Sequence, residues 1–325
     1  MRKTPDPIVP PLARERIERE VGALPPDALL CEQSGLSVFV ARAEQIPDTL
    51  TEIGRLRELT FRAAGEGTGH ALDLDVFDGW YEHLVCWHRD TGSIVGASRL
   101  GRLDTILPAH GDAGLYTATL FQFDPALLRS LVDTVELGRS FVRLDVRRSP
   151  VALPLLWRGI GRWLTRRPHL RRLMGPVGID ARYTPVSVAR MVGYLHGRHG
   201  GARLSGSVRP HVPWCPPSTE AARACAEGAF LPDLPSLWRA VEAAEPEGRS
   251  IPVLLRQYLK LGAEVLATSV DAAFADVVDA LLLVDLDAVE PARLAKFMGP
   301  EGAGAFLAAR GRAPRGRAPR GSAAA

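Results

Sequence analysis

Two charged residues three positions apart, Glu136 and Arg139, interrupt an apolar run at 135–142. Such a run is typical of a buried strand, where ionisable side chains are rare unless they are paired or carry out chemistry. Residues three apart in a strand point to opposite faces, so these two charges share a face only if a β-bulge lies between them. A lone buried carboxylate has a raised pKa and can accept a proton near neutral pH. The alternative interpretation is a structural ion pair.

An acidic loop precedes this pair along the chain, with carboxylates at Asp73, Asp75 and Asp78. Carboxylates this close repel one another unless an arginine, a metal ion or an amino group lies between them. Arg57 and Arg99, on the expected helix before the loop and the expected strand after it, supply the opposite charge. An isolated acidic loop is more often a solvated turn, so the prediction of a charged pocket depends on these arginines.

The sequence lacks the motifs of several other common sites. Its four cysteines show neither CxxC spacing nor a histidine at zinc-finger distance: Cys31, Cys86, Cys215 and Cys225. The acidic loop lacks the glycine and the final glutamate of an EF-hand, and the glycines at 65–69 are not followed by GK[ST]. Neither GxSxG nor HExxH occurs. We therefore expect no metal site, no disulfide framework and none of the commonest hydrolase chemistries.

The positive charge of the chain is small in sum but uneven in distribution. The 325 residues carry a net charge of +3, yet arginines gather at 143–148, 158–172 and 310–320. Such clusters suit an acidic partner, such as a phosphate-bearing carrier or an anionic membrane, although each is also typical of a solvated face. Arginines without interleaved aromatic residues give weak nucleic-acid binding, so we expect no nucleic-acid partner. No signal-peptide core or long apolar run occurs, which predicts a cytoplasmic protein, at most peripheral to a membrane.

Hydrophobic periodicity and turn residues predict strands that alternate with helices. The expected strands are 36–41, 83–88, 94–100, 134–142, 173–179, 263–267 and 277–286, and the expected helices are a segment starting near 48, then 125–132, 154–164, 185–196 and 251–262. The turn Asp90-Thr91-Gly92 joins two of the strands in a hairpin. This order predicts a mixed sheet flanked by helices, in the α/β (α+β) class.

The chain is expected to form one domain with loose ends. Residues 1–25 are rich in Pro, Arg and Glu and predict a flexible arm with a short helix. Residues 26–300 form the domain, in which 197–250 is dense in Gly, Pro and Arg. That segment reads as an insertion, with a helix at 219–227, before the last helix and two strands. Residues 301–325 predict a disordered tail.

These charged residues, in this order, resemble a branch of the GCN5-related N-acyltransferase (GNAT) superfamily, the putative hemolysin or ornithine-lipid synthase proteins. The resemblance runs from about residue 36 to 289, and the acyl-homoserine-lactone synthases are similar at a greater distance. The motifs are an arginine and phenylalanine on the first helix, the acidic loop, a strand arginine and E-x-x-R. In this sequence they are Arg57, Phe61, Asp73, Asp75, Asp78, Arg99, Glu136 and Arg139.

The resemblance implies a GNAT-like twisted sheet and an N-acyltransferase. A fatty acyl chain, 3-hydroxylated or not, would pass from acyl-carrier-protein phosphopantetheine to the α-amine of ornithine or glycine and give a lyso-aminolipid. The loop after the central strand departs from the acetyltransferase pattern Q/R-x-x-G-x-G/A, which favours an acyl carrier protein over coenzyme A as the donor. No tightly bound cofactor is implied.

The same resemblance assigns roles to individual residues. Glu136 would be the catalytic base that takes the proton from the ammonium, directly or through water, and Arg139 would be catalytic beside it. Replacing Glu136 by Gln should then reduce turnover at least about tenfold. Arg57, Phe61, Asp73, Asp75, Asp78 and Arg99 would bind the amino acid. The carrier arm would lie against Phe141, Val142, Arg143, Arg147 and Arg148, with backbone amides near 141–143 holding the oxyanion.

Two other functions remain open from the sequence. One is an acyl-homoserine-lactone synthase, which would consume a methylated sulfonium donor. The other is a non-catalytic, hemolysin-like protein that binds a membrane or a carrier and forms no acyl amide.

Overall fold

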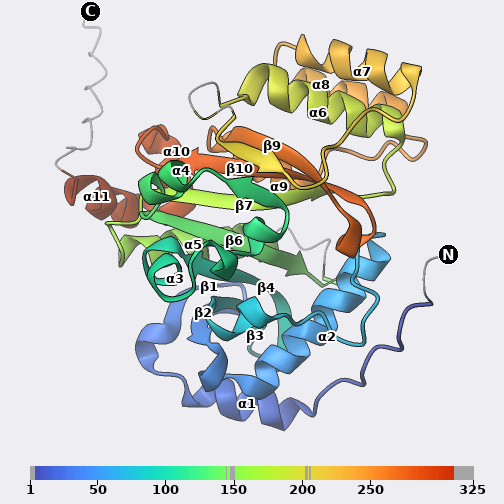
Figure 1. Cartoon of the computed structure of the whole chain (residues 1–325). Coiled ribbons are helices and arrows are strands. Elements are labelled where there is room, and N and C mark those ends of the chain that lie inside the picture. Colours follow the sequence, from blue (N-terminus) through green and yellow to red (C-terminus); the bar gives the residue numbers. More distant parts are fainter. Residues whose placement is uncertain (1–3, 144, 147–150, 202–203, 205, 311–325) are drawn as a thin grey trace, which may run out of the picture.

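An eight-stranded mixed sheet organises the computed structural model, which describes residues 4–143, 145–146, 151–201, 204 and 206–310. The strand order is β1-β2-β3-β4-β6-β7-β10-β9, and every neighbouring pair is antiparallel except β6 and β7 (Figure 1). The strands are β1 Leu29–Gln33, β2 Leu36–Arg42, β3 Glu82–His88, β4 Ser93–Arg102, β6 Thr134–Val142, β7 Arg172–Ile179, β9 Glu264–Asp271 and β10 Val277–Asp285. This confirms the expected fold class and every expected strand of the sheet.

Tight turns form the first half of the sheet. Ser34 and Gly35 both have positive φ, which is the backbone that a two-residue hairpin between β1 and β2 requires. The predicted hairpin of β3 and β4 is present, and Gly92 at its turn also has positive φ. A short pair, β5 Phe121–Phe123 with β8 Val208–Pro210, lies outside the main sheet.

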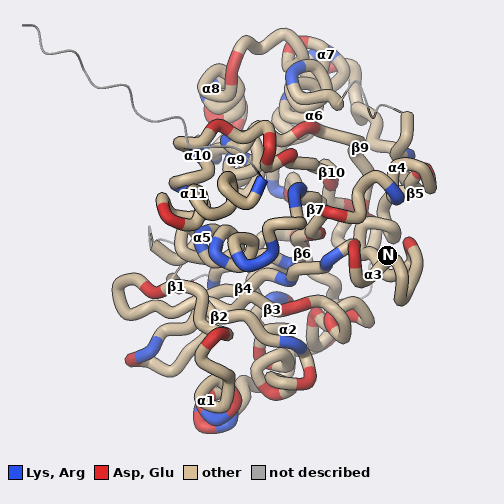
Figure 2. The backbone as a smooth tube through the Cα atoms, turned by 90° about the vertical axis from the view of Figure 1, so that its left-hand side faces the viewer, with Lys and Arg blue, Asp and Glu red and all other residues tan. Residues whose placement is uncertain are grey.

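Helices cover both faces of the sheet. Alternate residues of β10 belong to different hydrophobic clusters, because Ala280 and Leu282 pack on one side and Leu281 and Leu283 on the other. The first side is covered by α5 Ala152–Thr165, α9 Val253–Lys260, α10 Pro291–Met298 and α11 Pro300–Ala308, and the second by α2 Pro47–Ala63 and α3 Leu103–His110. We call these the α5 face and the α2 face. Figure 2 shows basic residues gathered along α5.

The two parallel strands at the centre, β6 and β7, pair over only three residues each. Thr134–Glu136 lie opposite Arg172–Met174, although both strands continue further. Gly175 follows at the last close approach, where a Cβ would lie 2.4 Å from the carbonyl oxygen of Leu137. Beyond that point the strands separate, and the sheet opens between them.

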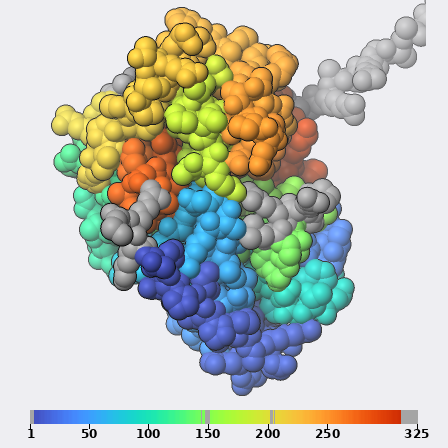
Figure 3. Space-filling view, turned by 90° about the vertical axis from the view of Figure 1, so that its right-hand side faces the viewer, coloured from blue at the N-terminus to red at the C-terminus, as the bar shows by residue number. Residues whose placement is uncertain are grey.

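The N-terminal residues are docked rather than loose. Helix α1 Arg14–Ala23 buries Ile17, and the Glu20 carboxylate accepts the amides of Asp48 and Thr49 at the start of α2. Figure 3 shows the segment before α1, in dark blue, against α2. The polar composition of this segment conceals the docking, in which hydrogen bonds to α2 accompany the packing of Ile17, Val21 and Leu24 on the core.

The segment predicted as an insertion is a helical layer beside the β9 edge. Helices α7 Thr219–Ala229 and α8 Leu234–Ala244 pack on α6 Pro185–His199 (Figure 1). Two expectations about the C-terminus are wrong. Helices α10 and α11 follow the last strand, so α9 is not the last helix, and α11 occupies the start of the predicted tail. Phe306 of α11 is buried, which explains why this Gly- and Ala-rich segment is ordered. The rest of the predicted tail, 311–325, lies outside the described residues.

Within the described part of the chain, no helix is long and apolar enough to cross a membrane.

Candidate active site

A β-bulge in β6 turns the two charged residues of that strand to one face. Ala97 of β4 faces Phe141, but Arg99 faces Gly138, so β6 accommodates an additional residue between these pairs. Arg139 lies in the bulge with a φ of 49°, a left-handed backbone that is uncommon outside glycine. The bulge that the sequence leaves open as a possibility is therefore present. Glu136 accepts the amide of Thr117, and Arg139 donates to the hydroxyl of the adjacent Tyr116.

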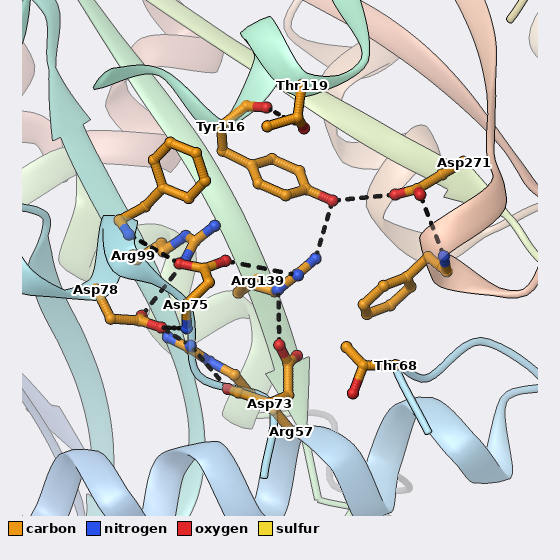
Figure 4. Close-up of polar contacts among 12 residues, drawn as sticks. Arg57, Thr68, Asp73, Asp75, Asp78, Arg99, Tyr116, Thr119, Arg139 and Asp271 are labelled. Atoms are coloured by element: carbon orange, nitrogen blue, oxygen red, sulfur yellow. Dashed lines mark hydrogen bonds and ion pairs between the residues drawn. The ribbon is translucent and has the colours of Figure 1, made fainter. Parts of the chain in front are cut away.

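Four residues form a buried ion-pair network, which we call the closed network: Arg57, Asp75, Asp78 and Arg99. Arg57 Nη1 donates to Asp78 Oδ1 at 2.8 Å, and Arg99 Nη1 donates to Asp75 Oδ1 at 2.6 Å (Figure 4). Both guanidinium groups are fully buried. Burial alone would raise the pKa of the Asp78 carboxyl, but Arg57 and Arg99 lower it far below its usual range.

Arg139 links this network to the residues beside it. Its Nε lies 3.2 Å from Asp73 Oδ1, and its Nη1 donates to the Tyr116 hydroxyl at 3.1 Å. The guanidinium also lies 4.4 Å from the centre of the Phe274 ring. The Tyr116 hydroxyl in turn donates to Asp271 Oδ2 at 3.1 Å (Figure 4). A continuous row of polar contacts therefore runs from the acidic loop to the end of β9.

Glu136 is buried away from any opening. Tyr81 donates its hydroxyl to Glu136 Oε2 at 2.8 Å, and the amide of Thr117 donates to Oε1 at 2.8 Å. Burial raises the pKa of the Glu136 carboxyl, as its position in an apolar strand predicts. Both of its oxygens are occupied and its side chain does not line the cavity described next, so direct proton transfer between Glu136 and a bound amine, as the resemblance implies, does not fit this position.

One large cavity, about 850 Å³ in volume, occupies the gap between β6 and β7. Its walls include Phe61 and Tyr116 on the α2 face, and Leu153 and Leu254 on the α5 face. Between these two groups, Phe141, Val142, Val177 and Gly178 of the separating strands complete the wall. The cavity therefore passes through the sheet and joins its two faces, and its size suits a small ligand or part of a larger one.

The predicted site residues that the structure describes fall into three groups, and two more lie outside the described residues. The cavity is lined by four of them, Phe61, Arg139, Phe141 and Val142. Six belong to the buried polar cluster behind it, Arg57, Asp73, Asp75, Asp78, Arg99 and Glu136. The Arg143 guanidinium donates hydrogen bonds to the Asp145 carboxylate and to the carbonyl of Ile94, and Arg143 does not line the cavity. Arg147 and Arg148 lie outside the described residues.

Several cavity residues are absent from the sequence-based prediction. On the α2 face these are Glu66, Asp271 and Asp279, which we call the acidic end of the cavity. On the α5 face Arg249 and Arg256 contribute, whereas the Arg182 side chain lies against the end of α2, where its Nη1 donates to the carbonyl of Ala63. Asp279 alone carried a recognisable signal, because it is the one acid inside the apolar run 277–284. The others lie in loops, where charged residues are ordinary.

The glycine-rich loop after α2 is held by a buried carboxylate. Glu58 accepts hydrogen bonds from the amides of Thr68 and Gly69 and from the Thr68 hydroxyl, and it pairs with Arg62. This anchors the glycine-rich segment that carries Glu66 to the cavity.

Among the described residues, no group of three or more His, Cys, Asp or Glu side chains could hold a metal ion.

Comparisons with known proteins find one similar domain model and two similar proteins. Residues 56–158, from α2 into α5, match the family model described as an acetyltransferase (GNAT) domain. A protein of Phocaeicola vulgatus named glycine N(alpha)-acyltransferase is 29% identical over 301 residues, which cover 87% of this chain and 89% of that protein. A protein of Bacteroides thetaiotaomicron with the same name is 29% identical over 299 residues, covering 87% of this chain and 86% of that protein.

Two solved structures are also similar in part. The CoA-dependent acyl-homoserine lactone synthase BjaI with MTA aligns over 86% of this chain and 90% of its own, with 11% identity and a TM-score of 0.39. The CoA-dependent acyl-homoserine lactone synthase MesI aligns over 85% and 96%, with 11% identity and a TM-score of 0.36.

Proposed function

We propose that this protein, an acyltransferase with a GNAT domain, transfers a fatty acyl group from a phosphopantetheine thioester to the α-amine of glycine. The product would be an N-acyl amino acid of the lyso-aminolipid type. The name shared by the two relatives supports glycine as the acceptor, and ornithine is the alternative to be tested beside it.

The passage through the sheet is the observation that carries this proposal. Amide formation from a thioester needs two substrates that meet at one carbon atom and approach it from different directions. The cavity is lined by residues from both faces of the sheet, where β6 and β7 separate. A thioester entering along the α5 face and an amine held on the α2 face would meet between the two strands.

The α5 face suits the donor. Apolar side chains of Leu153, Ile251 and Leu254 line this part of the cavity and would bury hydrocarbon. Helix α5 begins at Ala152, and the free amides of its first turn favour an anion such as a phosphate. Arg249 Nη1 is buried and makes no hydrogen bond to a described residue, although it lies 3.7 Å from Asp180 Oδ1, so it can still donate to a ligand.

The surface beside this end is basic. Arg256 lines the main cavity and also a groove between α8 and α9, whose wall includes Trp238, Arg239 and Lys260. Arg256 Nε is buried without a hydrogen-bond partner among the described residues. An acidic acyl carrier protein would be complementary to such a surface, which supports the carrier rather than coenzyme A as the donor.

The β6 backbone suits the developing oxyanion. The amide of Arg143 donates to the carbonyl of Val95 on β4. Amides alternate sides along a strand, so the amide of Val142 points away from β4 and toward the gap. A donor at this position would stabilise negative charge on the thioester carbonyl oxygen as the amine adds.

The test is a reconstituted reaction with the full chain. Palmitoyl-carrier protein and palmitoyl-CoA are each supplied with glycine, ornithine or S-adenosylmethionine, and mass spectrometry identifies the products. We expect N-palmitoylglycine with release of the thiol, faster from the carrier. Consumption of S-adenosylmethionine would instead identify a lactone synthase. A thioester that stays intact under all conditions would support the non-catalytic binding function.

A pair of variants tests the donor surface. Replacing Arg256 by Gln should raise KM for palmitoyl-carrier protein about tenfold, as expected for one lost charge-assisted contact. Arg223 of α7 is exposed and remote from the cavity, so Arg223→Gln is the matched control and should leave KM unchanged. Equal KM values for the wild type and Arg256→Gln would place the carrier elsewhere.

A further inference from the structure

Three carboxylates meet at the acidic end of the cavity, from segments far apart in the chain. Glu66 lies on the glycine-rich loop after α2, Asp271 ends β9, and Asp279 lies within β10 opposite Gly178 of β7. A Cβ built on Gly178 would lie 3.2 Å from Glu66 Oε1 and 3.6 Å from Asp279 Oδ1. The oxygens of Glu66 and Asp279 therefore face the same space above a residue that has no side chain.

The two aspartates of this group differ in their partners. Asp271 Oδ1 accepts the amides of Ala273 and Phe274, and Oδ2 accepts the Tyr116 hydroxyl. The Asp279 side chain has no hydrogen bond or ion pair to any described residue, although only 8% of its surface is exposed. That exposed part lines the cavity.

A buried carboxylate without a donor is unfavourable in its charged form. Burial, reinforced by the negative charges of Asp271 and Glu66, raises the pKa of Asp279 well above its ordinary value. Arg139 is the cation that opposes this shift, but its guanidinium is already used by Asp73 and Tyr116. Asp279 therefore lacks a positively charged partner, and a ligand cation in the cavity would provide one.

We infer that Asp279 is a catalytic residue of the acceptor site: its carboxylate binds the ammonium group of the amino acid and takes a proton from it before attack. Asp271 and Glu66 add negative potential that favours the cation over a neutral molecule. This inference rests on the proposed acyl transfer to an amine. It also replaces Glu136, whose oxygens are occupied away from the cavity, in the role of base.

The protons in this step are balanced. When the ammonium binds, Asp279 releases its own proton to water and becomes the counter-ion. It then takes one proton from nitrogen, and the neutral amine adds to the thioester carbonyl carbon. The C–N bond forms, the C–S bond breaks, and the second nitrogen proton passes to the departing sulfur. Thioester and ammonium thus give amide, thiol and one released proton, and Asp279 ends protonated as it began.

The test compares two acceptors that differ in their need for a base. Glycine carries an ammonium at neutral pH, whereas the amine of hydroxylamine is unprotonated there and can attack without losing a proton first. In Asp279→Asn, kcat/KM for glycine should fall at least about a hundredfold. Thiol release with hydroxylamine from the same thioester should stay within about threefold of the wild type, since the loss is confined to the proton transfer.

A steric variant tests the same space without changing a charge. The methyl group of Gly178→Ala would fall between Glu66 and Asp279 and would also press on Cγ1 of Val277, 2.9 Å away, whose side chain must shift. The backbone there is an ordinary strand, and KM for glycine should rise at least about tenfold. A methyl group on Gly304 of α11 would meet no neighbouring part of the chain within 4 Å, so Gly304→Ala is the matched control and should behave as the wild type.

Each outcome separates the two claims. If the wild type releases no thiol with either acceptor, the proposed function fails and the inference fails with it. If the wild type is active and Asp279→Asn, folded by circular dichroism, keeps glycine activity or loses both acceptors equally, the inference alone is overturned. Unchanged KM for glycine in Gly178→Ala would also overturn it.

Discussion

The closed network and the acidic end of the cavity contain the same kind of residue at similar burial, yet their chemistry is opposite. Asp78 lies between the guanidinium groups of Arg57 and Arg99, which keep it ionised despite burial. Asp279 lies among other carboxylates, and its pKa is raised. Burial therefore does not by itself mark a reactive carboxylate; the charge of the neighbours decides.

The charges beside each buried carboxylate also distinguish a structural role from a functional one. In the closed network each buried guanidinium faces a carboxylate, although Nε and Nη2 of Arg57 and Arg99 make no hydrogen bond to a described residue. Ion pairs of this kind are typical of structural networks, whereas a buried acid that lines a cavity can interact with a ligand. The charged residues that stand out in the sequence mostly belong to the first kind. Four variants test this comparison.

Breaking the closed network should have the largest effect. Asp78→Asn leaves two buried guanidinium groups with one carboxylate fewer, so the free energy of unfolding should fall by about 3–5 kcal/mol. Urea denaturation measures it. Asp145→Asn, which removes an exposed partner of Arg143, is the control and should change stability by less than about 1 kcal/mol. A small effect at Asp78 would mean that the network is not structural.

Glu136→Gln should lower stability by about 1–3 kcal/mol, because one buried hydrogen-bond acceptor is lost beside Tyr81 or Thr117. If Glu136 is structural, the pH dependence of kcat with glycine keeps its wild-type shape in this variant. Loss of the acidic limb of that pH profile, with turnover reduced tenfold or more, would return the role of base to Glu136.

The pH dependence of stability should reveal Asp279. Its folded pKa is raised, so the folded chain keeps a proton that the unfolded chain releases, and stability falls as pH rises from the unfolded pKa toward the folded one. Asp279→Asn lacks this loss. Its stability relative to the wild type should increase by up to about 1.4 kcal/mol per pH unit in that window, as measured by urea denaturation at several pH values. A constant difference would contradict the raised pKa.

The smallest effect is expected at the contact between the two regions. Tyr116→Phe removes the hydroxyl that joins Arg139 to Asp271 and should lower stability by about 0.5–1.5 kcal/mol. Tyr194 is buried but makes no hydroxyl hydrogen bond to a described residue, so Tyr194→Phe is the control in thermal unfolding. Equal shifts in Tm for the two variants would show that the Tyr116 contacts contribute nothing.

Much of the fold was predictable because its signals are local. The alternation at 36–41, the Asp90-Thr91-Gly92 turn and the apolar run 134–142 each act within a few residues and are confirmed as β2, the β3–β4 hairpin and β6. Helix α11 was missed because its Ala- and Gly-rich composition resembles a tail, and only its packing on α5 reveals that Phe306 belongs to the core.

The site was predictable in part. The order of charged residues correctly indicated that Arg57, Asp78 and Arg99 interact, since opposite charges in an apolar setting must pair. The sequence could not indicate which buried acid remains without a partner. Asp279 resembles Glu136 in every local respect, as one acid in an apolar strand.

The amino-acid sequence by itself determined most strands of the main sheet, and it indicated that opposite charges in an apolar setting pair. The tertiary structure decided which partner each charge obtained. Strand order brought β10 beside β7, and the separation of β6 from β7 opened a cavity at Asp279 while Glu136 was enclosed by Tyr81 and Thr117. Side-chain periodicity operates along a strand, whereas pKa and access depend on neighbours that are distant in the chain.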